Sequence, residues 1–378
     1  MRLRLSIPSA LALAALLALA GCASGAGRPQ SSQAPAAAPA SATSVDPGLQ
    51  ALVDGARREG ALSLIWGDGT MGGTEGIRRL ADGFNKQYGL NLDVRFTPGP
   101  SMPNMAARVA EEYTAGRPAA TDILVGYANH IMAAMQAGAI EQVDWASWAP
   151  NVQRPELVAA GGAAVAFQSS WPGIIYNAQH VRPDEVPHTL QDLLKPQYKG
   201  RIASTPYAAS FDQVAAPEVW GEERTFAYVR QLADQVAGLI RCNETQRLTS
   251  GEFDVLALAC SQNGAMEEKH KGAPIEFLIP ADAPLLVPLY AAVPKHAAHP
   301  NAAKLWINYL MSREAQDVVY EINGADNHEV PGSKAAKDLE HFQGAGLKFT
   351  RIDIAFYENN DERLGPVRDE LQRILTRQ

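Results

Sequence analysis

The chain has 378 residues and a net charge of −8, from 33 Lys and Arg against 41 Asp and Glu. This mildly acidic balance, without a basic stripe, argues against a nucleic-acid partner. The length predicts two domains or one large bilobed unit, and no segment after residue 22 is apolar enough to cross a membrane.

The N-terminus has the pattern of an export signal followed by a lipid-attachment site. Two arginines precede a run of Leu and Ala over 10–19, which is too short for a stable membrane anchor. The sequence Leu-Ala-Gly-Cys at 19–22 resembles a bacterial lipobox. This resemblance implies a signal peptide over 1–21 and a lipid on Cys22. An ordinary signal peptide with an incidental Cys is the alternative.

The segment 22–45 is almost entirely Ala, Pro, Ser, Gln and Gly, and it predicts a disordered tether because it cannot bury enough apolar area. The folded part then begins at Asp46, which suits a helix cap, with Pro47 at the first helical position. In chain order we expect a helix over 46–60, a strand over 61–66, a Gly-rich loop over 67–73, a helix over 74–89, a strand over 91–96, a helix opening at 98–101, a strand over 121–126 and a helix over 129–137.

Strands that alternate with helices at this spacing predict βαβ units and a parallel sheet. Right-handed crossovers place the loops after successive strands at one edge of the sheet. Ligands in open α/β sheets bind at that carboxyl edge. The loops after the first three strands are therefore the first places to expect a site.

The pattern changes after residue 160, where two extended runs at 163–170 and 173–177 are separated only by Trp171 and Pro172. They predict a crossover between two lobes. A second α/β series follows. We expect strands over 200–205, 237–242, 254–260 and 274–279, helices within 211–236, an extended return over 285–293, a long helix over 301–320 and a final helix over 362–376.

Three segments of the second half resemble one protein family. They are WPGIIYN at 171–177, TLQDLLKPQYKGRIA at 189–203 and HPNAAKLWINYLMS at 299–312. With the element order, they are similar to type 2 periplasmic solute-binding proteins of ABC importers, in the branch with ferric-iron, thiamine, polyamine and aminoethylphosphonate binders. The resemblance implies a two-lobed α/β fold, each lobe a mainly parallel sheet flanked by helices, joined by extended hinge segments. It places lobe one at 46–170 and 282–378 and lobe two at 171–281.

The same resemblance implies a function. We expect an exported lipoprotein, held by lipid at Cys22 on the periplasmic or cell-surface face of a bacterial membrane. It would act as a monomer without a cofactor, close on a small organic anionic or zwitterionic solute, and pass it to the permease subunits of an ABC transporter. A ferric-iron carrier, a ligand sensor for a signalling receptor and a secreted enzyme are the alternatives.

Candidate ligand-binding residues in lobe one follow the first three strands. In each case a structural role is the alternative: Trp66 can close its strand in the core, Ser101 can cap a helix and His130 can pack. Glycines after the first strand let the backbone approach a ligand. The candidates are Trp66, Gly67, Asp68, Ser101, Tyr127, Asn129 and His130.

Candidates in the hinge and lobe two are aromatic or small polar residues. Trp171 and Tyr176 can line a cleft or pack the hinge, and Tyr207 suits an aromatic wall. Ser210 and Asp212 are also ordinary helix-cap types. The candidates are Trp171, Tyr176, Tyr207, Ser210 and Ser261.

Neither metal nor catalytic chemistry has a motif in this sequence. None of the eleven tyrosines adjoins another, and such a pair is the main ligand set that the ferric binders of the resembled family use. There is no Gly-x-Ser-x-Gly elbow for a nucleophilic serine. Cys242 and Cys260 either form a disulfide, as an oxidising compartment favours, or remain two buried thiols.

Overall fold

The computed structural model describes residues 46–377. The predicted signal peptide, the lipid on Cys22 and the tether lie outside the described residues. No helix within the described range is long and apolar enough to span a membrane.

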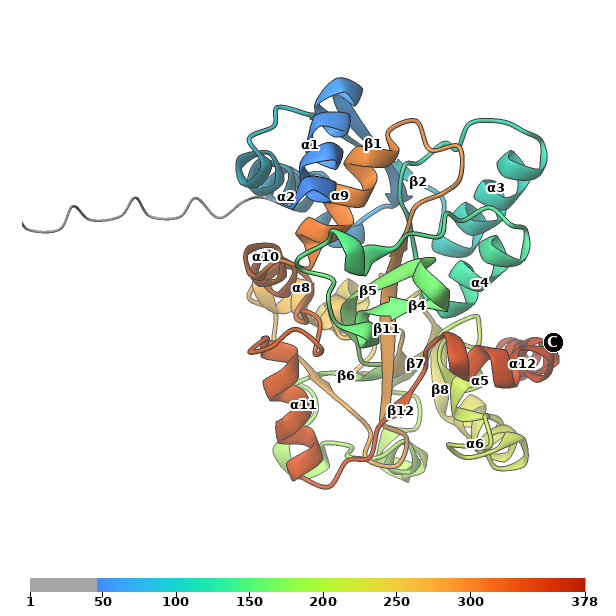
Figure 1. The fold of residues 1–378 in the computed structure, drawn as a ribbon. Helices are drawn as coiled ribbons and strands as arrows, with labels where there is room; N and C mark the ends of the chain where they lie inside the picture. Colours follow the sequence, from blue (N-terminus) through green and yellow to red (C-terminus); the bar gives the residue numbers. More distant parts are fainter. Residues whose placement is uncertain (1–45, 378) are drawn as a thin grey trace, which may run out of the picture. The chain divides into compact units, whose positions relative to one another are not determined.

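Lobe one begins with the helices and strands that the sequence predicts (Figure 1). Asp46 caps the first helix by accepting the N–H groups of Gly48 and Leu49, and Gly60 ends it in the left-handed region with a φ of 71°. The elements are α1 (Pro47–Glu59), β1 (Ala61–Gly67), α2 (Gly73–Tyr88), β2 (Asp93–Gly99), α3 (Met102–Thr114), β3 (Leu124–Gly126) and α4 (Ala128–Gln136).

The strands of lobe one lie in two separate sheets and are less parallel than the βα rhythm predicts. Strands β1 and β2 pair in parallel, from Ala61 opposite Asp93 to Gly67 opposite Gly99. Strand β3 pairs antiparallel with β11 (Leu285–Ala292), which returns from lobe two in the opposite direction. Strand β11 is distant in sequence from β3 and is not connected to it by a βαβ unit, so the two strands need not be parallel.

Lobe two contains a five-stranded mixed sheet in the order β10-β6-β9-β7-β8. Strand β7 runs parallel to β8 and β9, whereas β6 is antiparallel to β9 and β10. Its elements are β6 (Gly173–Asn177), β7 (Ile202–Ser204), α5 (Phe211–Val214), α6 (Glu222–Gln235), β8 (Val236–Leu239), α7 (Gln246–Thr249), β9 (Val255–Ala259), α8 (Asn263–His270) and β10 (Ile275–Leu278).

Two long buried strands carry the chain between the lobes, as the sequence predicts. Strand β5 (Ala164–Ser170) leads to β6, and β11 pairs with β5 in antiparallel fashion on its way back. Every residue of both strands is buried. The short strands β4 (Val158–Ala159) and β12 (Thr350–Arg351) lie at the two edges of this sheet.

The C-terminal part differs from the prediction in three places. The predicted helix over 301–320 is two helices, because Ser312 accepts the N–H of Ala315 and so caps a new one. A further helix, not predicted, follows, and the last helix starts at Ile354, where Asp353 caps it, rather than at 362. These elements are α9 (Pro300–Leu310), α10 (Arg313–Asn323), α11 (Lys334–Gly344) and α12 (Ile354–Thr376).

The segment 299–312, which contributes to the family resemblance, serves as structure within lobe one. The Nδ1 atom of His299 lies 2.7 Å from a carboxylate oxygen of Asp122, which is 1% exposed. Glu59 accepts from the side chain and backbone of Asn301. These contacts join α1, β3 and α9.

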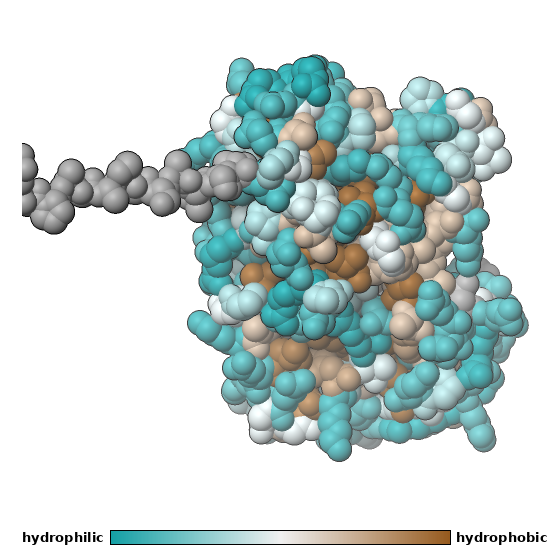
Figure 2. Space-filling model, viewed as in Figure 1, coloured by the Kyte–Doolittle hydropathy of each residue, from teal (hydrophilic) through white to brown (hydrophobic). Residues whose placement is uncertain are grey.

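Figure 2 shows one face of the molecule as mostly hydrophilic, with apolar residues in small separate patches.

Candidate functional site at the seam between the lobes

The loop after β1 does not present its tryptophan to a ligand. Trp66 is 2% exposed, and its indole N–H donates to the carbonyl of Ile123 at 2.8 Å. Its ring therefore packs in the core of lobe one, which argues against the predicted ligand contact. Gly67 is half-buried and Asp68 is exposed at the start of the turn.

The loop after β2 ends at Ser101, the N-cap residue of α3. Ser101 is exposed, and its hydroxyl makes no capping hydrogen bond to α3. The hydroxyl of Ser101 therefore does not cap α3, which was the alternative to ligand binding. Ser101 remains a candidate.

The loop after β3 carries two partly buried ionisable residues, Tyr127 and His130. The N–H of Tyr127 donates to Nδ1 of His130 at 3.3 Å, and the two rings lie 6.0 Å apart. Burial raises the pKa of the Tyr127 phenol, and the Ser170 side chain at the end of β5 partly opposes this rise. Burial and the nearby Arg368 charge lower the pKa of His130 to about 4, so its imidazole is neutral at pH 7. Asn129, beside them, is half-buried.

Two neighbouring residues of α5 complete this interior region from lobe two. Asp212 is 2% exposed and accepts from the Nε atom of Arg368 at 2.7 Å. Burial raises the Asp212 pKa, while the Arg368 charge and nearby backbone amides oppose the rise. Gln213 donates through Nε2 to the hydroxyl of Tyr357 at 3.2 Å. Both partners come from α12.

No sequence motif marks this cluster, and Asp212 alone has a local signal, that of a helix cap. Gln213, Tyr357 and Arg368 are ordinary residues of amphipathic helices, and no motif separates them from others. Only the docking of α12 beside α5 and α6 brings them to Asp212.

A disulfide lies at the carboxyl edge of the lobe-two sheet. Cys242 and Cys260 follow β8 and β9, and their sulfur atoms are bonded, which decides the question that the sequence left open. The N–H of Cys242 donates to the hydroxyl of Tyr207 at 3.0 Å. The bridge thus joins the strands on either side of β7, next to the loop that carries Tyr207.

The other predicted residues of lobe two have mixed positions. Ser210 is 5% exposed and makes no side-chain capping bond to α5. The hydroxyl of Ser261 accepts the N–H of Asn263 at 3.3 Å. Tyr176 is half-buried within β6, opposite Glu276 of β10.

Trp171 belongs to an apolar cluster rather than to a binding surface. It is 3% exposed, and its ring lies 6.1 Å from Phe342 of α11. Of the two roles considered for Trp171, the contacts favour hinge packing, which argues against the predicted ligand contact.

A chain of buried amides joins the lobes beside this hinge. The N–H of Trp171 donates to Gln262 Oε1 at 3.0 Å, and Gln262 Nε2 donates to the carbonyl of Asn323 at 3.2 Å. Asn323 Nδ2 donates to Gln168 Oε1 at 2.8 Å. Gln262 precedes α8 in lobe two and Asn323 ends α10 in lobe one, so the network pins the α8–α10 side of the molecule.

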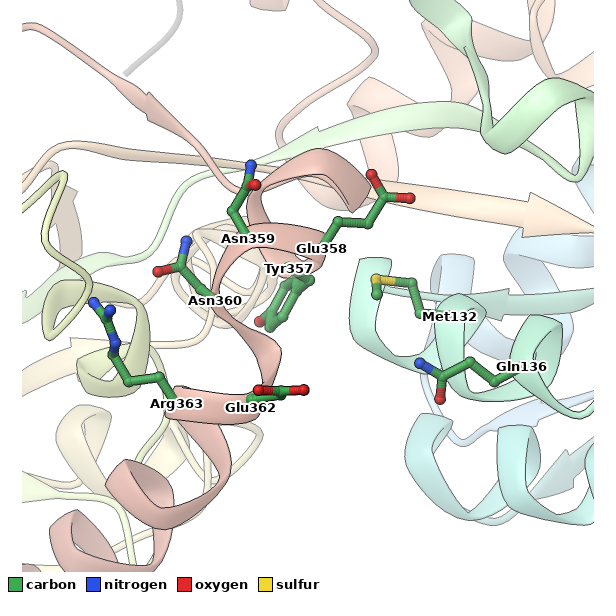
Figure 3. Close-up of a pocket in the computed structure, with 8 residues that line it drawn as sticks. All are labelled: Met132, Gln136, Tyr357, Glu358, Asn359, Asn360, Glu362 and Arg363. Carbon is green, nitrogen blue, oxygen red and sulfur yellow. The ribbon is translucent and has the colours of Figure 1, made fainter.

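The opposite side contains a cavity of about 660 Å³ between α4 and α12. Figure 3 shows Met132 and Gln136 on α4 across the gap from Tyr357 and Asn360 on α12. Polar contacts hold α12 to lobe two: Asn360 donates to Glu218 at 3.3 Å, and Arg377 donates to the carbonyl of Ala233 at 2.5 Å. The cavity therefore has lobe one on one side and a helix attached to lobe two on the other.

No group of three or more His, Cys, Asp or Glu within residues 46–377 is placed to hold a metal ion. The interior cluster instead has the neutral His130, one carboxylate paired with a guanidinium, and phenol and amide groups. Such a set suits the recognition of a polar organic molecule.

The profile of the bacterial extracellular solute-binding protein family matches residues 120–359. The chain belongs to this family. Among curated relatives, an Fe(3+)-binding periplasmic protein of Serratia marcescens is 25% identical over 164 residues, which are 41% of this chain and 45% of that protein. The chain spans about half the length of the curated relatives it matches.

Solved structures of type 2 periplasmic binding proteins show the same two-lobed fold. The periplasmic binding protein P5PA is 21% identical with a TM-score of 0.64, covering 82% of this chain and 99% of that one. The protein AfuA of Actinobacillus pleuropneumoniae, solved with fructose-6-phosphate bound, is 19% identical with a TM-score of 0.62, covering 84% of this chain and 97% of its own.

Proposed function

We propose that this family member is an extracytoplasmic solute-binding lipoprotein that captures a small organic solute and delivers it to an ABC importer. The observation that carries the proposal is the polar cluster of Tyr127, His130, Asp212 and Arg368, in which Asp212 is buried and the others are partly buried, and to which both lobes contribute. Buried ionisable groups are costly in a purely structural interior and concentrate at functional sites.

The expected mechanism is hinge closure. Strands β5 and β11 connect the lobes, and a rotation about them would change the spacing between α4 and α12. A solute that contacts both lobes stabilises the closed arrangement by its differential affinity for that state. The closed form would then dock on the permease subunits, with lipid at Cys22 keeping the protein at the membrane.

The solute class we favour is anionic or zwitterionic and organic. The Serratia relative binds ferric iron, so an iron carrier is the second candidate. Against it stand the absence of a His, Cys, Asp or Glu cluster for a metal among residues 46–377 and the lack of adjacent tyrosines.

A thermal-shift screen tests the proposal, with carboxylates, phosphonates, polyamines, thiamine and ferric citrate as probes. A ligand at 100 times its Kd stabilises the native state by about 2.7 kcal/mol, which raises the Tm of a domain of this size by about 4 °C. We expect an organic probe to produce this shift and to reduce the radius of gyration in small-angle scattering. A shift by ferric citrate alone would support the iron carrier, and turnover of a probe would support an enzyme.

A further inference from the structure

Two neighbouring side chains of α5 keep buried oxygen atoms without a hydrogen-bond partner. Asp212 uses Oδ2 for Arg368, but its Oδ1 has no partner among the described residues. Gln213 uses Nε2 for Tyr357, and its Oε1 likewise has none. The two residues are 2% and 8% exposed. Because a buried acceptor without a partner costs free energy, a donor group placed against these two oxygen atoms would stabilise the protein.

The Gln213 side chain is linked to the cavity between α4 and α12 through Tyr357. Tyr357, which receives the Gln213 hydrogen bond, is one of the residues that line it. Tyr357 is 2% exposed, and Figure 3 shows it on α12 at the edge of the space that faces α4. A volume of about 660 Å³ lies within the ordinary range for small-molecule sites.

The lining of the cavity is richer in acceptors than in cations. Glu358 and Glu362 carry carboxylates there, while the Arg363 guanidinium lies 3.6 Å from Glu222. Deeper in the seam, Arg368 is paired with Asp212, and His130 is neutral at pH 7. A solute carboxylate next to Asp212 Oδ1 and Gln213 Oε1 would face oxygen lone pairs, whereas a hydroxyl or ammonium group would donate to them.

We propose that the α4–α12 cavity is the entrance to a solute subsite in which Asp212 Oδ1 and Gln213 Oε1 accept hydrogen bonds from a hydroxyl or ammonium group. This inference rests on the proposed function and narrows its solute to molecules that carry a donor group, such as a zwitterion or a polyol acid. The C-terminal helix forms one wall of this subsite through Tyr357 and Arg368.

The test compares small charged probes that carry different hydrogen-bond donor groups. Thermal shift and titration calorimetry are run with the zwitterion 4-aminobutanoate, the hydroxy acid gluconate, the dicarboxylate succinate and inorganic phosphate. We expect binding of 4-aminobutanoate or gluconate to the wild-type protein. The Gln213→Met variant, which removes Oε1 at similar volume, is expected to weaken it about tenfold. Gln231→Met, on the exposed face of α6, is the matched control with unchanged affinity.

The remaining outcomes separate the two proposals. If Gln213→Met binds the donor probe as tightly as the wild type, or if succinate or phosphate alone binds, the subsite is wrong and the solute-binding function stands. If neither these probes nor the wider screen shifts the Tm, both proposals fail. Asp212→Asn, checked for native circular dichroism, replaces Gln213→Met if that variant does not fold, and the same weakening is expected.

Discussion

At the α8–α10 side of the molecule, Gln262 joins lobe two to Asn323 of lobe one through buried hydrogen bonds. At the α4–α12 side, a cavity of about 660 Å³ lies between the helices. We call these the pinned seam and the open seam. Both seams retain buried polar atoms without a hydrogen-bond partner among the described residues: Gln168 Nε2 and Trp171 Nε1 at the pinned seam, and Asp212 Oδ1 and Gln213 Oε1 at the open seam. The two seams therefore differ in geometry, because hydrogen bonds cross the pinned seam and a cavity lies at the open seam.

The largest expected effect comes from breaking the ion pair of the open seam. Arg368→Met leaves the Asp212 carboxylate buried without its charge partner, which typically costs 3 to 5 kcal/mol. Because the Arg368 side chain is 36% exposed and partly screened, we expect about 3 kcal/mol, measured by urea unfolding at pH 7. Arg363→Met, which breaks a longer and more exposed pair with Glu222, is the control with a loss below about 0.5 kcal/mol. Equal losses in both variants would mean that the open seam is no more dependent on its charges than the surface.

The second effect is a pH dependence that His130 introduces at the same seam. Its pKa is lowered from 6.5 to about 4 in the folded protein, so between these values the unfolded state binds more protons. The contribution of His130 to the free energy of unfolding is therefore fully present above pH 6.5, and it is lost as the pH decreases towards 4. His130 alone lowers the free energy of unfolding by about 3 kcal/mol at pH 4.

We expect His130→Asn to remove that part of the slope in unfolding measurements from pH 7 to pH 4. A residual slope will remain, because burial also lowers the pKa of His328 to about 4. An unchanged slope in the variant would show that His130 is not held neutral by burial beside Arg368.

The smallest of the three effects concerns the pinned seam. Gln262→Met removes both hydrogen bonds of the side-chain amide and leaves the buried N–H of Trp171 without an acceptor. We expect this change to lower the free energy of unfolding by about 2 kcal/mol. We also expect a larger radius of gyration in small-angle scattering, because the second seam is then free to open. If stability falls but the dimensions do not change, the amide network supports the fold without limiting the motion.

Local sequence patterns predicted most of the elements because their causes are local. The Asp46 cap, Gly60 and the apolar run after it place α1 and β1 within one or two residues. The crossover strands could be read from two apolar runs around Trp171 and Pro172. The break at Ser312 was missed because helical periodicity continues across it, and only the capping bond to Ala315 ends one helix and begins the next.

The candidate site was predicted less well, for a physical reason. Loops at the carboxyl edges of strands follow from chain order, and they led to Tyr127, His130 and Tyr207. For Trp66 the sequence leaves a core role and a ligand role open, because burial of its indole against Ile123 depends on packing that no local pattern encodes. Asp212 was read only as a helix cap, since its partner lies 156 residues further along the chain.

The sequence by itself determined the family, the alternation of strands and helices, and the crossover between two lobes. The tertiary structure alone decided that Cys242 and Cys260 are joined, that Gln262 pins one seam, and that α12 packs against α4, α5 and α6. Periodicity and capping depend on residues a few positions apart, whereas the partners of a buried charge or amide are set by which distant surfaces meet.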